Sequence, residues 1–226
     1  MPVWYFLCLA VSAMGFASCN NEPAKQSTEK QADSVSSKTA QRRISILDPE
    51  ALNILDSTAS IEVIASGFKW TEGPLYVKDG GYLLFSDVPA NKIYKWQDGK
   101  NTVVFLDHSG TTKPVVDPKE PGSNGLLLNN QGQLVLCQQG ERRMARMKAP
   151  LSDPKPEYLP LAASYKGKRL NSPNDAVYHP DGDLYFTDPA YGFSNGIHDS
   201  AKQLPFQGVF CLKPDGKLLL VTDELP

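Results

Sequence analysis

The sequence predicts an all-β fold of the β-propeller type, for three reasons. Residues 73–85, 125–136 and 175–186 each read as a short strand, a Gly-containing turn and a second strand. Such turns between apolar runs are strong signals of β-hairpins. No stretch carries the sustained 3.6-residue period of a helix. Finally, the 18 Pro and 17 Gly among the 226 residues suit a chain of many short strands.

Two of these hairpins are followed by a further pair of strands, at 92–106 and 208–222. Four antiparallel strands repeated about every 50 residues are typical of propeller blades. Residues 60–226 hold about three such repeats. Because three blades cannot close a ring, we expect this chain to be the N-terminal part of a longer protein.

The N-terminal segment is predicted to be an export signal of the lipoprotein type, residues 1–18. It is apolar and uncharged, and 16 residues from Val3 to Ser18 are too few for a bilayer span of about 20. Its ending, "FASC", resembles the lipobox of bacterial lipoproteins, which makes Cys19 the lipidated first residue. An ordinary cleaved signal peptide is the alternative. We expect an exported protein, periplasmic or at the cell surface, with a lipid anchor in a bacterial membrane.

Residues 19–45 have almost no apolar content, so we expect a disordered tether. The propeller-like domain is predicted over 46–226. The formal net charge of −2 argues against a nucleic-acid partner, and the lipid anchor is the expected membrane contact. Cys137 and Cys211 lie in apolar runs. They either form a disulfide or remain two buried thiols, and the apolar runs favour the thiols.

The repeats can be aligned on the residue that precedes each first strand: Glu72, Asn124 and Asn174, with spacings of 52 and 50 residues. In a propeller the first strands line the central channel, so these three side chains should meet. Their oxygen atoms are hard ligands suited to Ca²⁺ or Mg²⁺. Taken singly, "EGP", "SNG" and "PND" read as ordinary turns. Three such motifs at equivalent positions of the repeats favour a metal site.

Asp87 and Asp188 end the second strands of two repeats, in "FSD" and "FTD". We expect both carboxylates to hydrogen-bond to turn backbone.

Three stretches resemble the gluconolactonase, or senescence-marker-protein (regucalcin-like), family: "WTEGPLYVKDGGYLLFSDVPANKIYKW", "GSNGLLLNNQGQLVLCQQGERRMARM" and "RLNSPNDAVYHPDGDLYFTDPAYG". The resemblance covers about residues 60–226. It implies a six-bladed β-propeller, of which about three blades are present here. It also implies one divalent cation in the axial channel and hydrolysis of sugar lactones.

The resemblance places Glu72 as a metal ligand and Asn174 as a contact of the metal, its water or the substrate. Asn124 becomes a substrate-binding channel residue. The cation is expected to be Ca²⁺, with Mg²⁺ and Zn²⁺ as alternatives. The general base and the remaining ligands are expected beyond Pro226. Many close relatives carry His where this chain has Gln139, which leaves the substrate preference open.

Three further residues are candidates for substrate contacts. Asp175 follows Asn174 and either contacts substrate or braces its neighbour. Arg142 lies in the turn after a second strand, at the channel mouth or in a solvated loop. Tyr191 lies in an insertion, residues 189–205, that is longer than a hairpin loop, and such loops often gate a site.

The sequence therefore predicts a metal-dependent hydrolase of a small-molecule sugar lactone. On this reading the 226-residue chain alone should be inactive, because the base lies elsewhere. A propeller that binds sugar or a partner without catalysis is the main alternative. A related esterase on the same scaffold is the third.

Overall fold

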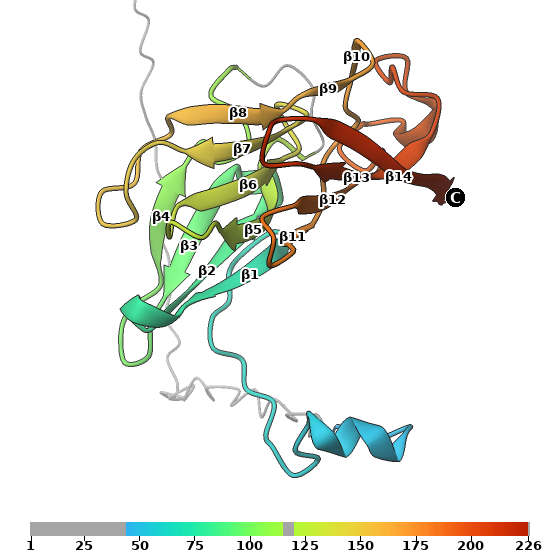
Figure 1. Cartoon of the computed structure of the whole chain (residues 1–226). Coiled ribbons are helices and arrows are strands. Elements are labelled where there is room, and N and C mark those ends of the chain that lie inside the picture. The colour runs from blue at the N-terminus through green and yellow to red at the C-terminus, as the bar shows by residue number, and fades with distance from the viewer. Residues whose placement is uncertain (1–43, 115–119, 226) are drawn as a thin grey trace, which may run out of the picture. The chain divides into compact units, whose positions relative to one another are not determined.

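The computed structural model describes residues 44–114 and 120–225 (Figure 1). It confirms the all-β prediction, with three four-stranded antiparallel sheets and one two-stranded sheet. The helical elements of the described residues are 3-10 turns of three to five residues. None of the helices in this part of the chain is long and apolar enough to cross a bilayer. Cys19 and the predicted signal lie outside the described residues.

The strands follow one another along the chain within each four-stranded sheet. The first sheet comprises β1 (Thr71–Val77), β2 (Tyr82–Asp87), β3 (Lys92–Trp96) and β4 (Val103–Asp107). The second comprises β5 (Ser123–Leu128), β6 (Leu134–Gln138), β7 (Arg143–Met147) and β8 (Tyr158–Ala162). The third comprises β11 (Ala176–Tyr178), β12 (Leu184–Asp188), β13 (Gln207–Leu212) and β14 (Leu218–Leu225). Strands β9 (Ser164–Tyr165) and β10 (Lys168–Arg169) form the small hairpin.

The 3-10 turns are η1 (Pro49–Asn53), η2 (Lys78–Gly80), η3 (Val88–Ala90) and η4 (Gly196–His198). The chain divides into two compact units, Met1–Ile61 and Glu62–Pro226. All fourteen strands of the described residues belong to the second unit. In the first unit, the side chain of Asp48 caps η1 by accepting a hydrogen bond from the backbone of Glu50 at 2.9 Å. Whether the propeller-like domain begins at residue 46 stays a prediction.

Strands β5 and β6 of the second sheet are buried on both faces, which explains their continuous apolar runs, LLL and LVLC. Successive side chains of a strand point to opposite faces. Leu134 and Leu136 of β6 therefore join a core shared with the first sheet. Val135 and Cys137, between and after them, join a core shared with Phe186 and other residues of the third sheet.

Both cysteines of the described residues are buried and free. The prediction of two buried thiols is confirmed, and the disulfide alternative is wrong.

The first strands of the three sheets lie close together (Figure 1), with β5 in contact with β1, β2 and β11. Two of these strands start with an irregular register against their partners, between Glu72 and Leu75 and between Ser123 and Leu126. Each contains one extra residue, which bends the strand where it approaches its neighbour. At these bends the backbones of adjacent sheets touch.

Glycines make this approach fit. A Cβ on Gly73 would lie 2.2 Å from the carbonyl oxygen of Asn124. A Cβ on Gly125 would lie 2.6 Å from Asp175 Oδ1 and 2.9 Å from the carbonyl oxygen of Asn174. The Gly125 amide instead donates a 2.8 Å hydrogen bond to that carbonyl. Side chains are therefore excluded where neighbouring first strands meet.

Carboxylates at the ends of the second strands hold the segments that lead into the first strands. Asp87 accepts hydrogen bonds from the amides of Lys69 and Trp70 at 3.1 and 3.2 Å. Asp188 accepts one from the amide of Asn171 at 2.7 Å. Both carboxylates bind backbone amides, as expected, but the expectation that these belong to the adjoining turn is wrong, because the amides lie 17 or 18 residues earlier, ahead of the first strand.

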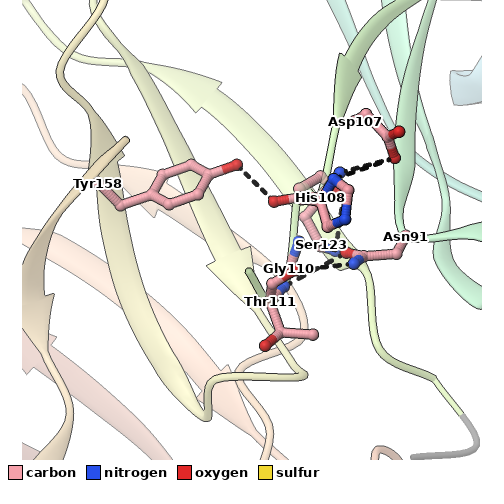
Figure 2. A network of polar contacts seen from close by, with 8 residues as sticks. Asn91, Asp107, His108, Gly110, Thr111, Ser123 and Tyr158 are labelled. Carbon is pink, nitrogen blue, oxygen red and sulfur yellow. Dashed lines mark hydrogen bonds and ion pairs between the residues drawn. The ribbon is translucent and has the colours of Figure 1, made fainter. Parts of the chain in front are cut away.

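The segment between the first and second sheets is held by side chains from both (Figure 2). Asn91 Oδ1 accepts hydrogen bonds from the amides of Gly110 and Thr111 at 2.8 and 3.3 Å. From the other side, the hydroxyl of Tyr158 donates to the carbonyl oxygen of His108 at 2.8 Å. Burial raises the pKa of Tyr158, which keeps this hydroxyl protonated as a donor.

We predict that Gly73→Ala lowers the free energy of unfolding by about 3 kcal/mol, through the left-handed backbone and the clash with Asn124. Gly81→Ala is the matched control. Gly81 has a φ of +61°, close to the +54° of Gly73, but a Cβ there would meet nothing within 4 Å. The control should lose about 1 kcal/mol. Urea unfolding measures both, and equal losses would contradict a steric limit at Gly73.

A second prediction concerns pH. Burial raises the pKa of Asp188 to about 7, although the amides of Asn171 and Ser172 act against it. The folded state therefore holds this proton between the unfolded value of 3.8 and about 7. The carboxyl's contribution to stability is complete below 3.8 and is lost as the pH rises to 7.

Asp188→Asn cannot titrate, so the wild type should lose stability relative to this variant as the pH rises from 4 to 7. Urea unfolding of the two proteins at several pH values measures the difference. A difference that stays constant over this range would contradict the elevated pKa.

Candidate functional site

A cavity of about 630 Å³ lies where the first strands converge. Glu72, Asn124 and Asn174 all line it. The structure thus brings together the three residues that the repeat alignment picked out, one from each four-stranded repeat. Glu72 lies within β1, Asn124 within β5, and Asn174 two residues before β11.

The backbones of these residues are linked to one another across the sheets. The Ser86 hydroxyl of β2 donates to the carbonyl oxygen of Asn124 at 2.9 Å. The Gly125 amide donates to the carbonyl oxygen of Asn174. Both carbonyls are thus engaged in contacts between sheets, and both residues line the cavity.

Glu72 is held by its neighbour Trp70. The indole Nε1 of Trp70 donates a 2.8 Å hydrogen bond to Glu72 Oε1. The indole itself lines the cavity and is 58% exposed. Trp70 therefore orients one oxygen of the carboxylate and presents an aromatic face to whatever enters.

A second carboxylate, Glu120, also lines the cavity. Its Oε2 accepts a 2.7 Å hydrogen bond from Gln139 Nε2. Gln139 Oε1 in turn accepts one from Asn124 Nδ2 at 2.6 Å. Sequence reasoning missed Glu120. The sequence offered one indication of it: Glu120 is an acidic residue four positions before Asn124, outside any predicted strand.

The insertion after β12 forms one wall of the cavity, through Tyr191, Phe193 and Ile197. Tyr191 is 63% exposed and lines the cavity, and its contact with substrate stays a prediction. The start of the insertion is anchored. Gln207 Oε1 accepts from the amide of Ala190 at 2.8 Å, and Ser172 Oγ accepts from the amide of Gly192 at 3.0 Å.

Arg142 lies outside this cavity, in an adjoining pocket. Its guanidinium donates to the carbonyl oxygens of Leu170, Asn171 and Ala201 at 2.8, 3.1 and 2.9 Å. It also packs over the ring of Phe193. Burial, and secondarily the charge of Arg169, lowers the pKa of Arg142 to about 10. These contacts give Arg142 the structural role of tying the insertion to the second sheet.

Asp175 also lies outside the cavity. Its Oδ1 accepts from the amide of Ala176 at 2.9 Å, and it lines a separate hollow on the third sheet. This geometry agrees with bracing of the strand start. The substrate contacts assigned to Asp175 and Arg142 stay predictions, and the structure supplies no cavity contact for either.

The cavity donors are carboxylate and amide oxygens, which fit a hard cation such as Ca²⁺ or Mg²⁺ in their chemistry. Within residues 44–114 and 120–225, no three His, Cys, Asp or Glu side chains gather as a metal site. The oxygen atoms that line the cavity are nevertheless of the kind that such a cation binds, and Glu72 and Glu120 are the acidic residues among them.

The chain is similar in sequence to proteins described as gluconolactonases. A gluconolactonase of Zymomonas mobilis subsp. mobilis is 40% identical over 186 residues, which is 81% of this chain and 51% of that protein. The chain thus spans about half the length of this curated relative.

Solved structures are similar as well. A structural-genomics target, a candidate gluconolactonase, shares 35% identity with a TM-score of 0.64, covering 81% of this chain and 58% of its own. A gluconolactonase of Xanthomonas campestris shares 29% identity with a TM-score of 0.55, covering 69% of this chain and 48% of its own.

The family profile described as the SMP-30/gluconolactonase/LRE-like region matches residues 70–226, a span that contains all three aligned residues. The chain therefore belongs to the SMP-30/gluconolactonase/LRE-like family.

Proposed function

We propose that this protein hydrolyses a sugar lactone with the help of a divalent cation held by Glu72 and Asn174. The observation that carries the proposal is the convergence of Glu72, Asn124 and Asn174 on one cavity of about 630 Å³. Membership of the family and 40% identity to a gluconolactonase support it. Ca²⁺ is the proposed ion, because all the donors are oxygen atoms.

Hydrolysis adds water across the lactone C–O bond and yields an open hydroxy acid. A divalent cation would stabilise the negative charge that develops on the carbonyl oxygen. The chain's own residues bind the sugar ring and orient the reacting groups. Trp70 keeps Glu72 Oε1 in place, and the exposed faces of Trp70 and Tyr191 hold the sugar ring. The amide of Asn174 orients the water or the carbonyl.

Sugar binding without catalysis is the second candidate function. The exposure of Trp70 and Tyr191 beside the cavity favours it, since aromatic side chains line ligand pockets whether or not chemistry follows. An esterase with another substrate is the third. A panel of lactones and open esters, assayed with Ca²⁺, Mg²⁺, Mn²⁺ and Zn²⁺, separates the three by product formation.

We predict that Glu72→Gln lowers the affinity for Ca²⁺ at least about tenfold, because it removes a full negative charge from a site with few acids while it keeps the shape. Isothermal calorimetry measures the affinity. Acid release from glucono-δ-lactone above the spontaneous rate measures hydrolysis, and it is followed in the longer protein in which we expect the general base. Both should fall together, and the thermal unfolding midpoint should stay close to that of the wild type.

Glu157→Gln is the matched control, since Glu157 is exposed and lies outside the cavity. It should leave Ca²⁺ affinity unchanged. A Glu72→Gln protein that binds Ca²⁺ like the wild type would rule out Glu72 as a ligand.

We also propose that the protein is exported and anchored to a bacterial membrane through lipid on Cys19, with residues 20–45 as the tether. The support is the apolar N-terminal run, its "FASC" ending and the polar stretch that follows. The chain makes no other proposed contact with membrane or nucleic acid.

If Cys19 is the lipidated residue, the mature chain begins there and carries acyl groups, so Cys19→Ala should release the protein from the membrane fraction. Mass spectrometry of the native N-terminus and fractionation measure this. Cys8→Ala is the control, because Cys8 lies in the segment that is removed. A mature N-terminus elsewhere would refute the anchor.

A further inference from the structure

Hydrogen bonds link three polar side chains at the cavity: Glu120, Gln139 and Asn124. Two hydrogen bonds join them, from Gln139 Nε2 to Glu120 Oε2 at 2.7 Å and from Asn124 Nδ2 to Gln139 Oε1 at 2.6 Å. Gln139 is 2% exposed and Asn124 is 6% exposed. Glu120 and Asn124 also line the cavity, whereas Gln139, which connects them, lines the adjoining pocket.

The hydrogen-bond chemistry of the three groups fixes the direction of both hydrogen bonds. An ionised carboxylate only accepts hydrogen bonds. Gln139 must therefore turn its NH₂ group to Glu120, which leaves its oxygen for Asn124. Asn124 must then turn its own NH₂ group to that oxygen. The remaining polar atom of Asn124, Oδ1, is left for the cavity.

Rotating the Asn124 amide by half a turn would place two acceptor oxygens against each other in a buried position. An unsatisfied buried acceptor is strongly disfavoured. Linked hydrogen bonds in a low-dielectric interior also polarise one another, which strengthens the preference. One carboxylate can thus set the orientation of an amide with which it makes no direct hydrogen bond.

Tight backbone contacts beside Gln139 and Glu120 hold these two residues close together. A Cβ on Gly140 would lie 2.2 Å from the carbonyl oxygen of Pro121. A Cβ on Gly122 would lie 2.4 Å from the carbonyl oxygen of Val88. The residue after Gln139 therefore packs directly on the residue after Glu120, which limits how far the two side chains can separate.

We propose that Glu120 and Gln139 are positioning residues that fix the Asn124 amide with Oδ1 toward the cavity. The cavity wall then offers an electron pair at this point. It favours a ligand group that accepts an electron pair, namely a cation or the hydrogen of a sugar hydroxyl. The inference rests on the proposed function for the identity of the ligand, but the orientation of the amide can be tested without any ligand.

The first test uses the metal-free protein with ¹⁵N-labelled asparagine. The Asn124 NH₂ group should show two separate proton signals, one shifted downfield and slow to exchange with solvent because it donates to Gln139. Gln139→Met removes the acceptor and keeps the size, so the downfield signal should disappear. Gln131→Met, at an exposed position, is the control and should leave it unchanged.

Gln139→His separates positioning from packing. A neutral imidazole has one donor and one acceptor, so it can replace the amide between Glu120 and Asn124. An imidazolium has two donors and cannot accept from Asn124. The downfield signal should therefore be present in this variant at pH 8 and lost below about pH 6. The wild type, recorded at the same pH values, is the control.

The second test measures Ca²⁺ affinity by calorimetry at pH 8. Gln139→Met should bind Ca²⁺ about tenfold more weakly although both carboxylates remain, and Gln139→His should stay close to the wild type. A Gln139→Met protein that keeps the downfield Asn124 signal and the wild-type affinity would overturn the proposal. Failure of the wild type to bind Ca²⁺ would refute the metal function, and the signal would still decide the orientation of Asn124.

Discussion

The structure depends on one steric constraint, the close approach of neighbouring first strands at positions without side chains. Gly73 packs on the backbone of Asn124, and Gly125 packs on the backbone of Asn174. A methyl group at either position would overlap a carbonyl oxygen, and overpacking of this kind typically destabilises a protein by 1–3 kcal/mol. Because each contact is between backbones, it fixes where a strand begins and hence where its first side chain lies.

Because of this constraint, different atoms of the same residues line the cavity and join the sheets. The carbonyl groups of Asn124 and Asn174 bind the adjacent sheet, while the side chains line the cavity. Changes to a cavity side chain therefore leave the contacts between sheets intact. The reverse does not hold, because a shift of the backbone at Gly125 would move both asparagines.

The sequence predicted the parts of the molecule that are encoded locally or repeated in phase. The hairpins followed from their turns, and Glu72, Asn124 and Asn174 followed from their spacing. Glu120 was missed because it lies in a loop, where no period marks the direction of a side chain. Arg142 was expected near the cavity, but its guanidinium binds carbonyls 28 to 59 residues away. No local pattern encodes such partners.

The ties made by the second strands have a consequence for how such a chain could arise. Asp87 binds the amides of Lys69 and Trp70, and Asp188 binds that of Asn171, so each carboxylate secures the lead-in segment of its own repeat. The residues that make one such contact thus lie within about 20 consecutive positions. A duplicated stretch of gene would encode both partners of the contact, so duplication could add a sheet whose first strand is already held in place. Divergence of the cavity residues could then follow, one repeat at a time.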